Sequence, residues 1–272
     1  MTTQPPQPHQ GVALITGATS GLGAEFAQQL AGKGYDLVLV ARDRDRLEAT
    51  AADLRATYGV NAEILAADLT DLDERAQVEQ RLASPEQPIT YLINNAGYGL
   101  PQEFHRNPVD DEQRMLELLA TVPMRLSHTV LPGMLSRGSG TILTVASIAG
   151  EAPLGMYAAA KAWPMSFSRW ANAHYRSRGV TFTALAPGFT RTEFHARLGV
   201  ERTEMAPGWM WLDADFVVRS ALRTASRGRR VSIPSVRYKL LWAFMKMTEP
   251  MILLFVARAG RTATDSASSP TR

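Results

Sequence analysis

The chain has 272 residues, 45% of them hydrophobic, which is enough for the core of one large domain or two small ones. Its formal net charge of +3 is too small to indicate a nucleic-acid-binding protein, and the absence of cysteine excludes disulfides and thiolate metal sites. A chain without cysteine agrees with a reducing cytoplasm, which is the location we expect. Residues 1–10 are rich in Pro and Gln and lack the charged and apolar regions of a signal peptide, so we predict a disordered leader there.

A glycine-rich turn follows the first apolar run, residues 12–15. The turn reads Thr16-Gly17-Ala18-Thr19-Ser20-Gly21-Leu22-Gly23, and an amphipathic segment begins at residue 24. Strand, turn and helix start come in the order of a dinucleotide-binding βαβ unit, in which glycines admit a pyrophosphate and the helix N-terminus attracts it. The predicted cofactor contacts are Gly17, Thr19, Ser20, Gly21, Leu22 and Gly23. The alternative is a strand-to-helix turn that binds nothing.

Apolar runs and helical patterns then alternate along the chain. We predict strands over 12–16, 37–41, 62–67, 91–94, 140–146, 180–186 and 230–233, and helices over 22–32, 43–57, 71–83, 110–136, 156–178 and 213–226. This alternation predicts an α/β fold, a three-layer, Rossmann-type doubly wound parallel sheet of about seven strands. Since no linker divides the pattern, we assign residues 11–235 to a single NAD(P)-binding domain.

Charged residues follow the second and third strands, where a doubly wound sheet binds its ligands. Arg42 stands where an acidic residue would accept hydrogen bonds from an adenosine 2′-hydroxyl, and a guanidinium suits a 2′-phosphate instead. The sequence therefore favours NADP(H) over NAD(H), unless Arg42 is a solvated charge at a helix start. Asp68 and its neighbour Leu69 are predicted to meet the adenine edge, although Asp68 is also a candidate N-cap of the following helix.

Tyr157 and Lys161 lie four residues apart in a helical pattern and therefore share one face of the helix. A tyrosine with its ordinary pKa of about 10 exchanges protons poorly near pH 7, but a neighbouring ammonium favours the phenolate. Ser147, at the end of the fifth strand, can hold a substrate oxygen. We predict Ser147, Tyr157 and Lys161 as the catalytic residues, with Tyr157 as general acid and base.

Over residues 10–200 the chain resembles the classical short-chain dehydrogenase/reductase (SDR) family. The motifs that carry the resemblance are Thr16-Gly17-x3-Gly21-x-Gly23, Asp68-Leu69, Asn94-Asn95-Ala96-Gly97, Ser147, Tyr157-x3-Lys161 and Pro187-Gly188-x3-Thr192. The resemblance implies hydride transfer between a nicotinamide and a carbonyl or alcohol, with Ser147 orienting the substrate oxygen. It also implies a homodimer or homotetramer joined through the two long helices near 110–136 and 156–178.

The same resemblance assigns further cofactor contacts. Lys161 is expected to bind the nicotinamide ribose and to lower the pKa of Tyr157. Asn95, Ala96 and Gly97 line the cofactor by this analogy, and Pro187, Gly188 and Thr192 contact its nicotinamide end. For Thr192 a simple turn or cap role competes with this interpretation.

Two positions depart from the family pattern. Leu119 stands where members commonly carry an Asn that helps to hold a water beside the Lys, and the gap between Ser147 and Tyr157 is a few residues shorter than in many members. A leucine cannot hydrogen-bond, so proton delivery must follow another route. The alternative function is a catalytically weak nucleotide-binding sensor or scaffold, although such a protein needs none of the three catalytic residues.

The segment after Thr192 forms a flexible lid in the family. Phe194, Met205 and Trp209 are the candidates to cap an apolar ketone, aldehyde or 3-oxoacyl substrate. The rival interpretation is that the segment 209–211, Trp-Met-Trp, only anchors the next helix, with Asp213 as N-cap. His195 touches a polar substrate group or is an exposed helix residue. No histidine shows metal-ligand spacing, so we predict no metal.

An apolar extension is predicted over residues 236–259, followed by a disordered tail over 260–272. Its apolar runs, 238–247 and 251–257, are separated by Pro250 and are shorter than the roughly 20 residues of a membrane span. Packing on the domain or between subunits is favoured over peripheral membrane contact through Trp242, Phe244 and two lysines. The basic residues around 223–239 are interpreted as a solvated face.

Overall fold

The structure, a computed structural model, describes residues 10–194 and 206–248. Seven strands form one parallel sheet in the order β3-β2-β1-β4-β5-β6-β9. The strands are β1 (Gly11–Thr16), β2 (Tyr35–Ala41), β3 (Ala62–Ala66), β4 (Ile89–Asn94), β5 (Gly140–Val145), β6 (Val180–Leu185) and β9 (Val231–Ser232). The order reverses direction between β1 and β4, so the strand ends at that point frame the place where such sheets bind ligands. The predicted Rossmann-type sheet is confirmed.

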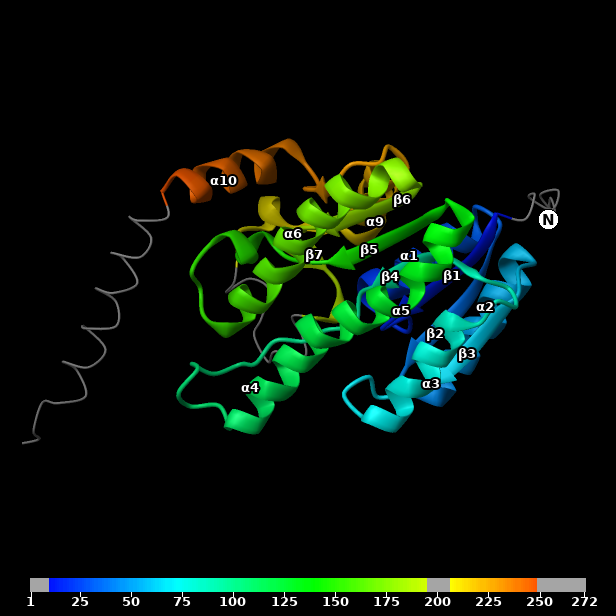
Figure 1. Ribbon diagram of the computed structural model, residues 1–272. Helices are drawn as coiled ribbons and strands as arrows, with labels where there is room; N and C mark the ends of the chain where they lie inside the picture. The colour runs from blue at the N-terminus through cyan, green and yellow to red at the C-terminus, as the bar shows by residue number, and fades with distance from the viewer. Residues whose placement is uncertain (1–9, 195–205, 249–272) are drawn as a thin grey trace, which may run out of the picture.

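Helices cover both faces of the sheet (Figure 1). One layer is formed by α1 (Gly21–Ala31), α2 (Arg44–Tyr58) and α9 (Ala214–Ser226), and the other by α3 (Leu72–Ala83), α5 (Val122–Arg137) and α6 (Met156–Tyr175). Successive residues of β1 enter opposite layers, with Ala13 and Ile15 in the first core and Val12 and Leu14 in the second. This explains why the strands read as continuous apolar runs.

The predicted helix over 110–136 is interrupted. It consists of α4 (Val109–Leu116), a π-helical turn (Glu117–Thr121) and α5. Pro123 lacks an N–H group, so the carbonyl of Leu119 cannot accept the bond that an α-helix would give it. The wider turn, closed by the bond from Val122 N to Glu117 O, fits this local loss of a donor.

A second, two-stranded sheet was not predicted. It pairs β7 (Thr190–Arg191) with β8 (Leu212–Asp213) and is braced by an ion pair from Arg191 Nη1 to Asp213 Oδ1 at 2.9 Å. Asp213 occupies the predicted N-cap position of α9 in an extended backbone conformation, but its side chain makes no capping hydrogen bond. The sheet joins the two ends of the segment that the sequence analysis treats as a lid.

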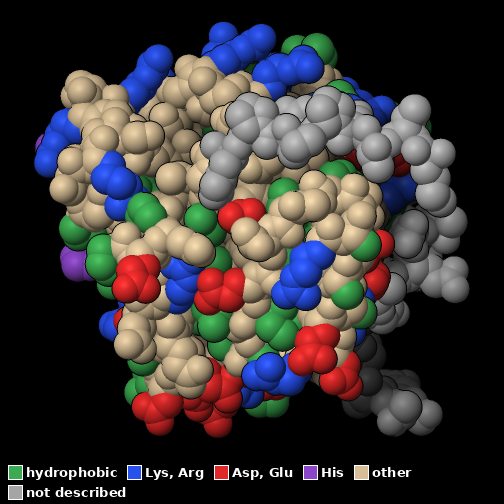
Figure 2. Space-filling view, turned by 90° about the vertical axis from the view of Figure 1, so that its right-hand side faces the viewer, with side chains coloured by type: hydrophobic (Ala, Val, Ile, Leu, Met, Phe, Trp, Pro, Cys, Tyr) green, Lys and Arg blue, Asp and Glu red, His purple; other side chains and the backbone are tan. Residues whose placement is uncertain are grey.

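The last described helix, α10 (Val236–Met247), lies along the upper edge of the molecule in Figure 1. Tyr238 is its one buried residue. Figure 2 shows the side of the molecule opposite α10, where Lys and Arg side chains gather along the upper edge and acidic side chains along the lower one. No helix within 10–194 or 206–248 has both the length and the apolar character to cross a membrane. Residues 1–9 of the predicted leader, residues 249–259 of the predicted extension and the whole predicted tail, 260–272, lie outside the described residues.

Candidate active site

The glycine turn between β1 and α1 has the shape that an anion site requires. Gly17 and Gly21 have positive φ angles of 66° and 55°, and a Cβ on Gly23 would overlap the carbonyl oxygen of Gly17. The side chain of Ser20 makes no capping hydrogen bond to α1, whose first turn carries no acidic residue. The positive end of the helix dipole therefore faces the turn without a carboxylate beside it. Thr19 and Leu22 complete this turn, with Leu22 packed against the core.

Asn95 secures the turn from the end of β4. Its Nδ2 donates to the carbonyl oxygens of Thr16 (2.9 Å) and Gly17 (3.2 Å). In return, Thr16 Oγ1 accepts from the backbone N–H groups of Asn95 and Ala96. The Nδ2 group of Asn95 is thus used to support the glycine turn, and a contact of Asn95 with the cofactor stays a prediction. Gly97 follows at the surface, beside Leu119 and Lys161.

Arg42 and Asp68 lie together at the ends of β2 and β3. Arg42 is exposed and forms no ion pair or hydrogen bond within the described part of the chain. Burial of Asp68 acts to raise its pKa, but hydrogen bonds from Thr70 and the charges of Arg114 and Arg42 outweigh it, so the net pKa is lowered. The exposed guanidinium of Arg42 suits a phosphate carried by an adenosine.

The structure shows which residue caps α3, the helix that follows Asp68. Asp71, and not Asp68, caps α3 by accepting from Asp73 N and Glu74 N. Leu69 is buried, its carbonyl accepts from Arg75, and its contact with the adenine edge stays a prediction.

Ser147 and Tyr157 meet in front of β5. Ser147 caps a short helical turn, with its Oγ accepting from Ala149 N at 3.2 Å, and its hydroxyl also hydrogen-bonds the half-buried Tyr157. Burial raises the pKa of Tyr157 to about 12, and the Ser147 hydrogen bond partly opposes this rise. The shorter connection thus still brings the two hydroxyls together.

Lys161 lies one turn further along α6, almost fully buried. Its Nζ donates to the carbonyl of Val145 at 2.7 Å and lies 5.9 Å from the centre of the Tyr157 ring. Burial lowers the pKa of Lys161 to about 8. The expectation that Lys161 lowers the pKa of Tyr157 is not met in this arrangement, in which burial is the dominant influence on both groups.

Leu119 occupies the π-helical turn beside these residues. It is buried in a cluster with Met115 and Ala160, against which Tyr157 also packs. A Cβ on Gly97 would lie 2.7 Å from Leu119 Cδ2 and 3.6 Å from Lys161 Nζ. The space between the lysine and the turn is therefore closed by a hydrocarbon side chain.

The loop after β6 supplies the last cofactor candidates. Pro187 is buried, and Gly188 lies against the ring of Tyr238 from α10. The Tyr238 hydroxyl accepts from Phe189 N at 3.0 Å and donates to Met210 O at 2.8 Å. No motif in the sequence links Tyr238 to this loop, so this role could not be predicted.

Thr192 lies across the glycine turn, 3.2 Å from the position of a Cβ on Gly21. Its Oγ1 accepts from Phe194 N, which agrees with the competing turn role. On the other side, Arg46 at the start of α2 donates to Thr19 O (3.1 Å) and pairs with Glu193 (3.4 Å). Arg46 therefore links the glycine turn to the 190–194 loop.

The structure places the predicted substrate-binding residues in different environments. The ring of Phe194 lies 6.2 Å from that of Tyr157, where it can contact a substrate. Trp209 is 65% exposed, and its predicted substrate role is not supported. Trp211 is buried, donates to Ala206 O and packs on Phe189, so the anchoring interpretation holds for this residue. Met205 and His195 lie outside the described residues.

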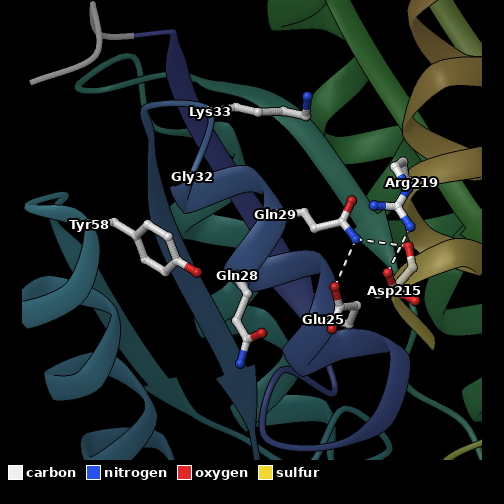
Figure 3. Close-up of a pocket in the computed structure, with 8 residues that line it drawn as sticks. All are labelled: Glu25, Gln28, Gln29, Gly32, Lys33, Tyr58, Asp215 and Arg219. Atoms are coloured by element: carbon white, nitrogen blue, oxygen red, sulfur yellow. Dashed lines mark hydrogen bonds and ion pairs between the residues drawn. The ribbon is translucent and has the colours of Figure 1, made fainter. Parts of the chain in front are cut away.

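A surface groove lies away from these groups, between α1, α9 and the end of α2 (Figure 3). Four of its polar residues interact with one another: Gln29 donates to Glu25 and to Asp215 O, and Arg219 pairs with Asp215. Within the described ranges, no group of three or more His, Asp or Glu residues is arranged to hold a metal ion.

Comparison with known proteins agrees with this geometry. A family model described as short chain dehydrogenase matches residues 11–202. The very-long-chain 3-oxoacyl-CoA reductase of Anas platyrhynchos is 33% identical over 190 residues, which make up 66% of this chain. The chain spans only about 60% of the length of that relative.

Two solved structures match over nearly their whole length. A short-chain dehydrogenase from Sphingobium yanoikuyae in complex with NADPH is 35% identical, with a TM-score of 0.80, and the match covers 96% of this chain and 98% of that one. The bulky-bulky ketone specific alcohol dehydrogenase from Comamonas testosteroni is 32% identical, with a TM-score of 0.76, and covers 94% of this chain and 95% of its own.

Proposed function

We propose, since this chain belongs to the short-chain dehydrogenase family and is an oxidoreductase, that it reduces apolar ketones, aldehydes or 3-oxoacyl groups with NADPH, and that Tyr157 is the general acid. The observation that carries this proposal is the Ser147–Tyr157 hydrogen bond at the carboxyl end of β5, with Lys161 buried behind it. This cluster faces the same edge of the sheet as the glycine turn.

A dinucleotide fits the residues present. The uncapped N-terminus of α1 suits its pyrophosphate, and the unpaired guanidinium of Arg42 suits a 2′-phosphate. The preference for NADP(H) rests on Arg42, and the NADPH-bound Sphingobium yanoikuyae protein supports it. When bound, the nicotinamide supplies the hydride that reduces the carbonyl carbon.

The chain's own residues then handle the oxygen and its proton. Ser147 and Tyr157 together bind the carbonyl oxygen, and the Tyr157 hydroxyl donates its proton as negative charge develops there. The raised pKa of Tyr157 keeps its proton in place at neutral pH. Lys161 fixes the end of β5 through Val145 and supplies a positive charge near the phenol.

We infer an apolar substrate from the side chains that surround Tyr157. Phe194, Leu119 and the neighbouring Met156 place hydrocarbon and aromatic surface around Tyr157. The curated reductase acts, by its name, on very-long-chain 3-oxoacyl-CoA, and the Comamonas testosteroni enzyme on bulky ketones. A bulky apolar carbonyl compound is therefore the substrate class that we propose.

The test combines cofactor titration with turnover. NADPH and NADH are titrated by fluorescence at one salt concentration into wild type and Arg42→Ala, and turnover is measured on a panel of apolar ketones and 3-oxoacyl thioesters. Losing a charge-assisted bond worth roughly 1.5–3 kcal/mol should weaken NADPH binding about 10- to 100-fold and leave NADH binding unchanged. Tyr157→Phe should lower kcat about 10²- to 10⁴-fold with unchanged NADPH affinity.

Turnover that survives Tyr157→Phe would contradict the assigned role. The second candidate function, a nucleotide-binding sensor or scaffold, is motivated by Leu119 beside the lysine. Tight NADPH binding without turnover on any carbonyl would favour that candidate instead.

We also propose that the protein is a cytoplasmic homo-oligomer that pairs through α5 and α6. The outer face of α6 carries an aromatic row in which Trp163 stacks on Phe167 and Trp170 stacks on His174. Trp170 is 54% exposed, and Met124 on α5 is 42% exposed. Light scattering of wild type and Trp170→Glu tests this, and a monomeric wild type would contradict it.

A further inference from the structure

Among the described residues, helix α10 presents an exposed apolar stripe that no other segment covers. Val236, Leu240, Phe244 and Met247 are each between 62 and 83% exposed, although most large apolar side chains of the protein are buried. They are spaced by four, four and three residues, so they share one face of the helix. Within the described residues, α10 is attached to the domain chiefly by Tyr238 on its opposite side.

Basic side chains flank this stripe. Arg237, Lys239 and Lys246 are exposed, and α10 contains no acidic residue. The surrounding sequence has the same character: residues 216–248 include eight Arg and Lys and no Asp or Glu. Only Arg219 among these eight pairs with a carboxylate in the described part of the chain.

The positive charge beside the stripe indicates what kind of partner surface α10 can bind. A second copy docked by the same face would bring the same cations together, since a two-fold contact pairs a patch with itself. An anionic lipid surface supplies both an apolar layer for the stripe and negative charge for its flanks. Lys246 lies 5.4 Å from the centre of the Trp242 ring, and such aromatic and cationic side chains suit the headgroup region.

We propose that α10 docks in the plane of an anionic lipid bilayer, with the stripe Val236, Leu240, Phe244 and Met247 inserted at the acyl boundary. The contact is peripheral, and it reverses the preference of the sequence analysis for packing over membrane contact. The apolar run over 251–257, which follows α10 in the sequence, adds further apolar residues to the same end of the chain. The proposal stands independently of the reaction proposed above.

The experiment is co-sedimentation of the full-length protein with vesicles. Vesicles of phosphatidylcholine alone are compared with vesicles containing 30 mol% phosphatidylglycerol (roughly the anionic share that a charged leaflet needs). Wild type should bind the anionic vesicles at least about 10-fold more tightly, and raising the salt about tenfold should weaken binding. The double variant Leu240→Glu/Phe244→Glu should bind about 10-fold or more weakly. The matched control Leu72→Glu, on an equally exposed leucine of α3, should bind like wild type.

Three outcomes would overturn the proposal. One is wild type that does not sediment with anionic vesicles. Another is binding that is equal for the α10 double variant and wild type. The third is an oligomer, seen by light scattering, that Leu240→Glu/Phe244→Glu dissociates, which would assign the stripe to a contact between copies. Thermal unfolding of the double variant, expected to match wild type because both side chains are exposed, excludes a folding defect.

Discussion

The ring of Tyr238 lies directly against Gly188, fifty residues earlier in the chain, in the loop that carries the predicted nicotinamide contacts. A Cβ added to Gly188 would overlap three carbon atoms of the ring. The hydroxyl of the same tyrosine joins Phe189 N to Met210 O. One side chain thus fixes the loop after β6, the 208–210 turn and the first turn of α10 relative to one another.

Gly188→Ala should therefore destabilise the protein and weaken NADPH binding. The added methyl cannot be accommodated unless Tyr238 moves, and overpacking of this kind costs about 1–3 kcal/mol. Denaturant unfolding and NADPH titration measure the two effects. Gly208→Ala is the matched control, because a Cβ there meets no atom within 4 Å. An unchanged free energy of unfolding in Gly188→Ala would show that the contact is not tight.

Tyr238→Phe should lower the free energy of unfolding by about 1–3 kcal/mol, because it leaves Phe189 N and Met210 O without their partner. Tyr91→Phe gives the opposite expectation. The Tyr91 hydroxyl is buried and has no hydrogen-bond partner among the described residues, so its removal should be neutral or stabilising. Thermal unfolding of both variants checks the contrast, and equal destabilisation by the two would refute it.

The sheet was predictable because each strand is a short apolar run bounded by turn residues, and the strand ends were found to within about two residues of the observed bounds. The glycine turn was predictable for a similar reason, since Gly17 and Gly21 adopt positive φ angles that few other residues tolerate. These features are encoded within a few neighbouring residues.

The remaining features depend on distant contacts. The sequence of the π-helical turn has the periodicity of an ordinary helix, and Pro123 is its one local sequence signal. Trp209 and Trp211 could not be distinguished in the sequence. In the structure Trp209 is exposed, whereas Trp211 is buried and anchors the segment. Asp213 looked like a helix cap, but Arg191, brought close by the β7–β8 pairing, takes its carboxylate.

Leu119→Asn should change proton delivery rather than cofactor binding. The amide would bring a hydrogen-bonding group to the space beside Lys161 that Leu119 now closes. We expect a higher kcat and a smaller solvent deuterium effect, with unchanged NADPH affinity, at a cost in stability of about 1–3 kcal/mol from the buried amide. Leu119→Met, which keeps the apolar volume, is the control. Identical kcat values and isotope effects in all three proteins would show that the position does not govern proton delivery.

Lys161→Met should stabilise the protein by an amount that depends on pH. Burial lowers the pKa of Lys161 to about 8 in the folded state, whereas an unfolded chain holds it near about 10.4. Below pH 8 both states are protonated and the folded state bears the full cost of a buried ammonium, about 3 kcal/mol for a shift of this size. Between pH 8 and 10 the unfolded state binds more protons, so the free energy of unfolding of wild type rises with pH.

The variant lacks this group, so its advantage over wild type should shrink by about 2 kcal/mol between pH 7 and 10. The raised pKa of Tyr157 lowers the free energy of unfolding as the pH approaches and passes about 10, but it acts on wild type and variant alike and therefore cancels in their difference. Denaturant unfolding at pH 7, 8, 9 and 10 measures the difference, with Lys239→Met, which removes an exposed lysine, as the control. Parallel curves for wild type and Lys161→Met would mean that the ammonium is not buried at a cost. A shrinking gap would instead show that the fold gives up stability to keep a positive charge behind Tyr157.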